Sequence, residues 1–104
     1  MLGELEQVVM LAVLRLDGEA YGVPIRSEIA ERSGRELTLA TVYKTLSRLE
    51  DKGLVASYEG EPTPQRGGRR KRFYDVTPAG RQVLKQSVGA LRRMVAGLDL
   101  GWEI

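Results

Sequence analysis

The chain has 104 residues, 42% of them hydrophobic, which suits one domain with a single core of modest size. It contains no cysteine and no histidine, so disulfides, thiolate metal sites and histidine general bases or zinc ligands are excluded. A secretion signal and an apolar run of about 20 residues are both lacking, which predicts a cytoplasmic protein without a membrane contact. It carries no P-loop, zinc motif or nucleophile elbow, and neither an enzyme activity nor a cofactor is expected.

The net charge is only +2, but the basic residues are unevenly distributed along the chain. One short segment holds a basic cluster made of Arg66, Arg69, Arg70, Lys71 and Arg72. Such a cluster on an otherwise balanced chain is typical of a phosphate-binding surface. A solvated hairpin that carries its charges for solubility is the alternative interpretation.

Three helices are expected in the first half of the chain. Residues 4–16 and 23–33 repeat apolar side chains at helical spacing, and Gly34 suits the position after a helix end. The third helix is expected over 38–52, with Thr38 as its N-cap.

The second half is expected to form a hairpin followed by a long helix. Residues 54–59 and 70–76 have the pattern of strands, and the glycine- and proline-rich segment 60–68 between them is expected to be a loop. Thr77 and the proline after it are typical of a helix start, and this last helix is expected to end near residue 98.

The last helix carries an apolar stripe with alternating four- and three-residue steps, formed by Leu84, Val88, Leu91, Val95 and Leu98. A narrow stripe of this kind is typical of a coiled-coil seam, so these residues are predicted to form a homodimer contact. The alternative is that the helix folds back on its own domain. The order of elements indicates a mainly α fold with a small β-hairpin, the winged helix-turn-helix. Residues 1–77 would be the DNA-binding domain and 78–104 the dimerisation helix and tail, in one structural unit.

The outward face of the third helix is slim, polar and cationic. It carries Ala40, Thr41, Lys44, Ser47, Arg48 and Asp51. A helix that enters the major groove of DNA needs such a face, and Arg48 would bind either a guanine edge or a phosphate. An ordinary solvent-exposed face is the alternative. Tyr43 at the flank is expected either to reach a phosphate or to complete the core.

Three stretches of the sequence resemble the PadR-like family of bacterial transcriptional regulators. They are Tyr21-Gly22 followed by Ile25, the segment from Thr41 to Val55, and the segment from Gly67 to Gly80. The resemblance covers nearly the whole chain and is closest to the short members, which end soon after one C-terminal helix. Lys44 stands where many members have proline, so the resemblance does not imply a base preference.

The resemblance implies a homodimeric repressor that binds a palindromic operator in double-stranded DNA. It implies DNA contacts from the third helix through Thr41, Tyr43, Lys44 and Arg48, and from the hairpin through residues 69–72. A small-molecule effector would have to bind in the dimer cleft. The competing interpretation is a winged-helix module that binds another protein without sequence-specific DNA binding.

Overall fold

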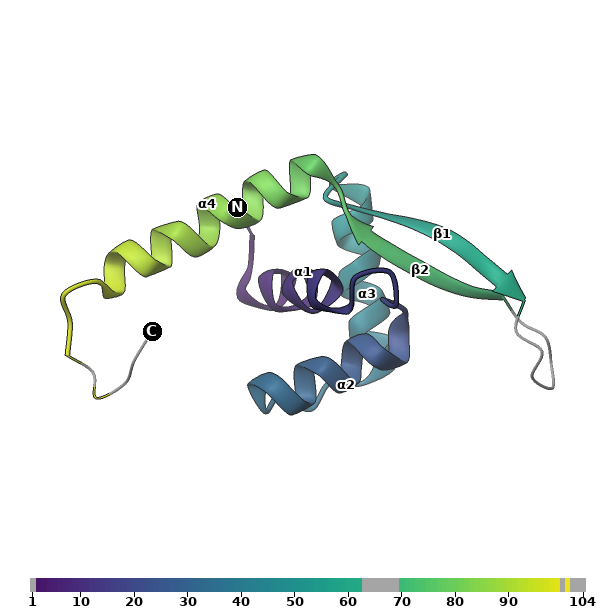
Figure 1. The fold of residues 1–104 in the computed structure, drawn as a ribbon, viewed down its shortest axis with the longest axis horizontal. Coiled ribbons are helices and arrows are strands. Elements are labelled where there is room, and N and C mark those ends of the chain that lie inside the picture. The colour runs from purple at the N-terminus through teal and green to yellow at the C-terminus, as the bar shows by residue number, and fades with distance from the viewer. Residues whose placement is uncertain (1, 63–69, 100, 102–104) are drawn as a thin grey trace.

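The computed structural model describes residues 2–62, 70–99 and 101. Their elements follow the predicted order, from three helices through a two-stranded hairpin to a last helix (Figure 1). The elements are α1 (Glu4–Leu16), α2 (Gly22–Ser33), α3 (Leu39–Asp51), β1 (Val55–Pro62), β2 (Arg70–Val76) and α4 (Pro78–Val95). None of the described helices is both long and apolar enough to cross a membrane.

Two element ends differ from the sequence-based prediction by more than one residue. Strand β1 continues to Pro62, because a bulge between Glu59 and Pro62 lets the strand resume its pairing with β2. Helix α4 ends at Val95, three residues earlier than predicted from the apolar stripe. Ala96 leaves the helical region, and Gly97 adopts a φ of 83°, which stops the helix.

The starts of α3 and α4 are fixed by the threonine caps that the sequence predicted. The Thr38 hydroxyl accepts a hydrogen bond from the Thr41 amide at 3.1 Å, and the Thr77 hydroxyl accepts one from the Gly80 amide at 3.0 Å. Each bond satisfies an amide that has no partner within its own helix. The two caps therefore set where α3 and α4 begin.

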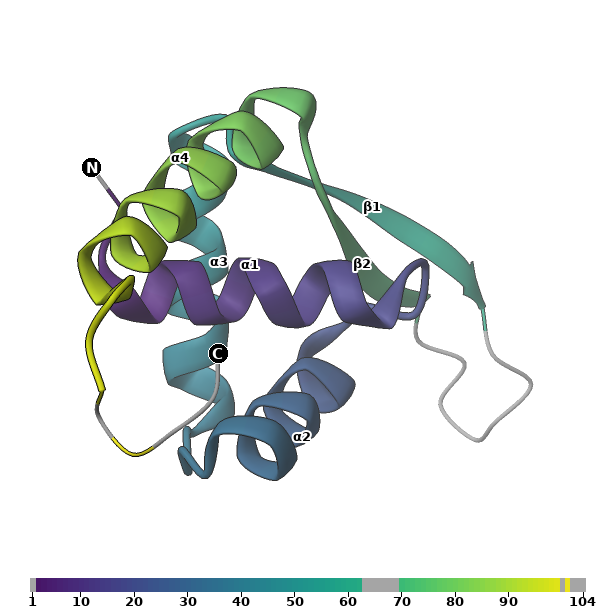
Figure 2. The same cartoon turned by 60° about the vertical axis from the view of Figure 1, so that its left-hand side comes forward.

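The core lies where α1, α2 and α3 meet the inner face of the hairpin. Helix α1 runs through the middle of the molecule, with α2 on one side and α3 crossing it (Figures 1 and 2). The largest fully buried side chains are Met10, Ile25, Leu46, Leu49, Val9, Val42 and Val55. Because these residues come from α1, α2, α3 and β1, the three helices and the hairpin share one core.

The hairpin is antiparallel and extends away from the helices (Figure 1). Its register pairs Val55 with Val76 at the base and Glu59 with Arg72 farther out. The Tyr74 amide also donates a hydrogen bond of 2.8 Å to the carbonyl of Ala20, so the segment between α1 and α2 borders the outer edge of β2. Three helices followed by such a hairpin form a winged helix-turn-helix, and the predicted fold class is confirmed.

Helix α4 is tied to the base of the hairpin at its first turn. The Thr77 amide donates to the Leu54 carbonyl at 3.0 Å, and the Thr77 hydroxyl donates to the Gly53 carbonyl at 2.8 Å. Gly80 packs directly on the Leu54 carbonyl, where a Cβ atom would overlap it. From this attachment α4 runs away from the hairpin, toward the opposite end of the molecule (Figure 1).

Candidate nucleic-acid interface

Helix α3 has the two faces that the sequence predicted. Its inner face is buried in the core, whereas Lys44, Ser47 and Arg48 are exposed. Thr41 is half-buried, and its hydroxyl oxygen accepts a hydrogen bond of 2.9 Å from the Thr38 hydroxyl. The exposed face therefore combines short polar side chains with two cations, a composition that suits close approach to a polyanion.

Tyr43 packs against α2 and is also partly exposed. Its ring packs against Gly22, the first residue of α2, so closely that a Cβ atom at Gly22 would overlap the tyrosine hydroxyl. The side chain is nevertheless 44% exposed, beside the cationic face of α3. Gly22 thus has a packing role that the sequence reasoning did not assign, although its place after Tyr21 at a helix start was a signal for it.

A buried carboxylate lies near the C-terminal end of α3. At its C-terminal end, the Lys52 ammonium binds the buried carboxylate of Glu6 at 2.7 Å, and the Gly3 amide donates to the same carboxylate at 2.9 Å. Burial raises the pKa of Glu6, but these hydrogen bonds and the charges of Lys52 and Arg48 outweigh it and hold the pKa below its ordinary value. An ionised carboxylate therefore lies within the electrostatic reach of Arg48.

The basic cluster of the hairpin is only partly described by the structure. Arg66 and Arg69 lie outside the described residues, as does the side chain of Arg70 at the start of β2. Lys71 places its ammonium 4.4 Å from the centre of the Tyr21 ring, and Arg72 donates a hydrogen bond of 2.8 Å to the Ser57 hydroxyl. The Lys71 and Arg72 side chains thus contact the protein itself.

The predicted stripe on α4 divides into two parts. Leu84 is only 4% exposed and belongs to the core of its own chain, and Val88 packs partly against that core. This half matches the alternative in which the helix folds back on its own domain, so Leu84 has little surface left for a partner. Leu91 is 58% exposed, and Val95, the last residue of the helix, is half-buried. Leu98 is 59% exposed and lies beyond the helix end, not on the helix as predicted. Met94, which the stripe did not include, is 76% exposed.

An apolar cavity of about 370 Å³ adjoins the exposed part of α4. Its lining comes from the start of α1 with the residues just before it and from the C-terminal half of α4, and consists of Leu2, Glu4, Gln7, Ser87, Ala90, Leu91 and Met94. Because Leu91 and Met94 line this cavity and are themselves largely exposed, the surface is both hollowed and apolar. It has the features of a surface that a second apolar body covers.

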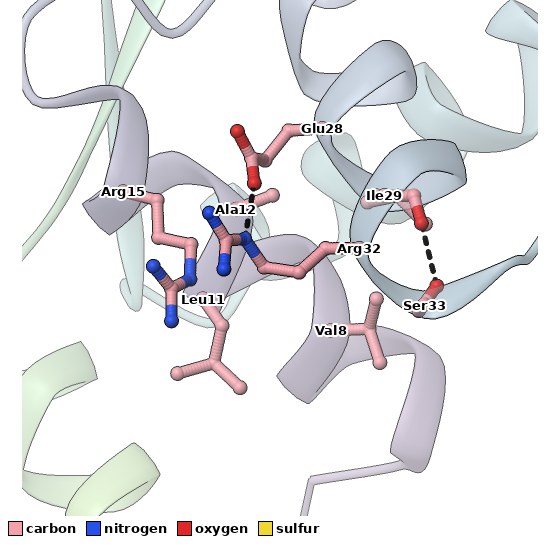
Figure 3. A pocket seen from close by; sticks show the side chains of 8 residues that line it. All are labelled: Val8, Leu11, Ala12, Arg15, Glu28, Ile29, Arg32 and Ser33. Atoms are coloured by element: carbon pink, nitrogen blue, oxygen red, sulfur yellow. Dashed lines mark hydrogen bonds and ion pairs between the residues drawn. The ribbon is translucent and has the colours of Figure 1, made fainter.

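A second cavity lies between α1 and α2 and has a volume of about 230 Å³ (Figure 3). Val8, Ala12 and Ile29 form an apolar lining, and Arg15 and Arg32 border it. The Arg32 guanidinium forms an ion pair with Glu28 at 2.6 Å, so the charge of one of the two arginines beside the cavity is already neutralised. Its volume is below the 300–1,000 Å³ typical of small-molecule sites, and it is a weaker ligand candidate than the cavity beside α4.

Comparison with known proteins identifies the family. Residues 10–86 match the transcriptional regulator PadR-like family. The chain is 36% identical over 78 residues to a transcriptional regulator of Mycobacterium tuberculosis, which covers 75% of the chain and 68% of the relative. It is 30% identical over 103 residues to an uncharacterized protein of Lysinibacillus sphaericus, covering 97% of the chain and 90% of the relative.

Solved structures agree with this assignment. A PadR family transcriptional regulator from Eggerthella lenta superimposes with a TM-score of 0.69 at 28% identity, covering 90% of this chain and 81% of that one. A PadR family transcription regulator from Clostridium difficile gives a TM-score of 0.63 at 30% identity, covering 85% and 93%. Both of these structures and the Mycobacterium tuberculosis relative are transcriptional regulators by name. Since the family match spans most of the chain, from within α1 into α4, this protein belongs to the PadR-like family of transcriptional regulators.

Proposed function

We propose that this regulator binds double-stranded DNA in a sequence-specific manner as a homodimer, and that it represses transcription in the cytoplasm from a palindromic operator. The observation that carries the proposal is the exposed face of α3, where Lys44, Ser47 and Arg48 stand on the side opposite the buried core. In a winged helix-turn-helix this helix enters the major groove, where such side chains reach base edges.

The exposed side chains of α3 have different roles in this proposal. Lys44 and Thr41 lie near the N-terminal end, the end that contacts base edges in helix-turn-helix proteins. Arg48 lies one turn farther on, within reach of the ionised Glu6, so part of its field is balanced inside the protein. We assign Lys44, Thr41 and Ser47 to base edges, Arg48 to a base or a phosphate, and Tyr43 to a phosphate beside the α2 start.

The hairpin supplies the second set of contacts. It extends from the same core that holds α3, and β2 begins with three residues of the basic segment 66–72, Arg70, Lys71 and Arg72. Arginine and lysine side chains there bind phosphates and add affinity without reading sequence. In this proposal Arg66, Arg69 and Arg70 make those contacts.

The exposed apolar surface at the C-terminal end of α4 supports the proposed dimer. Leu91 and Met94 on α4 and Leu98 beyond its end are largely exposed, and the cavity beside the start of α1 adjoins the two helix residues. A second copy covers this surface when its own α4 packs across it, with Val88 and Val95 at the border. Two copies also present two α3 helices, which a palindromic operator requires about 34 Å apart. In this proposal, a small-molecule effector would bind in the cleft between the two copies.

The test is selection of bound duplexes from a random pool, followed by titration of the selected duplex at several salt concentrations. We expect a two-fold symmetric consensus whose half-sites lie about one helical turn apart, with an affinity that falls steeply as salt rises. Lys44→Ala should change the consensus, whereas Lys85→Ala, an exposed change on α4, should not. Failure to enrich any sequence, together with binding that does not respond to salt, would favour a protein-interaction module instead.

A further inference from the structure

Three aromatic rings join the hairpin to the segment between α1 and α2. The Tyr21 and Phe73 rings meet edge to face, with centroids 5.4 Å apart and planes at 62°. Tyr58 of β1 stacks on Phe73 at 5.7 Å with planes at 19°. Such contacts add to the free energy of burial and fix relative orientation. The cluster therefore connects both strands of the hairpin to a residue that precedes α2.

Lys71 completes this cluster. It lies two residues before Phe73 in β2, so both side chains are on the same face of the strand. The Lys71 ammonium sits 4.4 Å from the Tyr21 ring centre and 3.3 Å from its hydroxyl oxygen, to which it donates a hydrogen bond. The half-buried lysine therefore makes both a cation–π contact and a hydrogen bond with Tyr21 in the free protein.

The base of the hairpin is held at this place by further contacts. The Tyr74 amide donates to the Ala20 carbonyl, directly before Tyr21 in the chain. On the opposite face, Arg72 donates to the Ser57 hydroxyl, which donates to the Glu50 carboxylate at 2.6 Å near the end of α3. The hairpin is thus tied to the α1–α2 segment on one face and to α3 on the other.

We propose that Lys71 is a positioning residue, which holds the hairpin at a fixed angle to α3 through Tyr21, and that it is not one of the phosphate ligands. This differs from the role that the sequence suggested for Lys71. The inference rests on the proposed function, because the angle matters when hairpin and α3 bind one duplex together. Tyr21 then affects DNA binding without touching DNA.

The first experiment uses the free protein and needs no DNA. A double-mutant cycle combines Tyr21→Leu with Lys71→Met and measures the unfolding equilibrium constant by chemical denaturation. We expect a coupling of about two- to five-fold between the two changes, the range of a partly exposed cation–π contact. Tyr21→Phe, which keeps the ring and removes the hydroxyl, should retain part of the coupling. Strictly additive effects would overturn the proposal, whatever the protein binds.

The second experiment measures DNA affinity and its salt dependence for the same variants, at a temperature where circular dichroism shows each one folded. Tyr21→Leu removes no charge, yet we expect it to weaken binding as much as Lys71→Met, and the double variant should lose no more than either. A phosphate ligand behaves differently: Lys71→Met would lower the salt slope by about 0.9 in either Tyr21 background, and Tyr21→Leu would leave binding unchanged. That result would overturn the proposal. Lys85→Met on α4 is the matched control for loss of a lysine charge.

The two experiments separate this inference from the proposed function. A protein that binds no duplex refutes the DNA-binding function, while the cycle in the free protein still shows whether Lys71 and Tyr21 hold the hairpin together. A protein that binds DNA but gives additive effects in both experiments retains the function and loses the positioning role.

Discussion

Gly80 is the point where α4 packs against Leu54, the residue directly before β1, and Gly80→Ala tests how firmly the two are joined. A Cβ atom there would overlap the Leu54 carbonyl oxygen and would lie 2.9 Å from a methyl carbon of Val76. The Leu54 carbonyl already accepts the Thr77 amide at 3.0 Å, so it can move away only by weakening that bond.

The expected magnitude follows from three terms. Overpacking of a close contact costs about 1–3 kcal/mol, and weakening of the Thr77 hydrogen bond costs about 1 kcal/mol. Alanine regains at most about 1 kcal/mol of helix propensity over glycine. We therefore expect Gly80→Ala to lower the free energy of unfolding by about 1–3 kcal/mol, which lowers the midpoint temperature by about 4–8 °C per kcal/mol in a domain of this size.

Gly89→Ala is the matched control in the same helix. The nearest atom to a Cβ there is the end of the flexible Arg93 side chain at 3.3 Å, which can move aside. The helix-propensity term then acts alone, and the variant should be stabilised by up to about 1 kcal/mol. Chemical denaturation followed by circular dichroism measures both variants. If Gly80→Ala proves as stable as Gly89→Ala, the close contact between α4 and Leu54 does not exist in solution.

Three further predictions address charge, base reading and association. Because the pKa of Glu6 is lowered in the folded state, the Glu6–Lys52 ion pair stabilises the protein at pH values above 4.5, the ordinary pKa of Glu6. This stabilisation is lost as pH falls through the lower pKa of the folded state. The stability advantage of wild type over Glu6→Gln should therefore shrink below pH 4.5 in acid denaturation. Arg48→Ala should relax one position of the selected DNA consensus at a cost of about 1–3 kcal/mol, and an unchanged consensus with weaker binding would make Arg48 a phosphate contact. Leu91→Asp should give monomers in sedimentation at micromolar concentration, since it places unpaired charges in the seam, whereas the exposed change Gln86→Asp should leave the dimer intact.

Most of the fold could be predicted because its signals are local. Thr38 and Thr77 mark helix starts through bonds that span three residues, and the apolar spacing of α3 separates its buried face from its exposed one. The same reasoning placed Lys44, Ser47 and Arg48 on the outward face, where the structure has them exposed. Local chemistry is sufficient for such features because neighbouring residues decide them.

The contact between Lys71 and Tyr21 could not be predicted in this way. The two residues are 50 positions apart, and they meet only because the Ala20 carbonyl borders β2. In the sequence, Lys71 is one base among several in a row and appears equivalent to its neighbours. A strand alternates its side chains between two faces, so such a row always divides into two sets. Which set faces the protein depends on the tertiary packing, which the row itself does not encode.

The division of the α4 stripe follows from the length of the helix and its point of attachment. An 18-residue helix is about 27 Å long, and its first turn is fixed to the base of the hairpin by Thr77 and Gly80. Leu84 lies close enough to that attachment to reach the core, whereas Leu91 and Met94 lie beside the start of α1 and remain exposed. Periodicity identifies residues on one face but not the body that covers them. Because one end of α4 is rigidly joined to the hairpin and its core, pairing at the other end would also set the separation of the two α3 helices in a dimer.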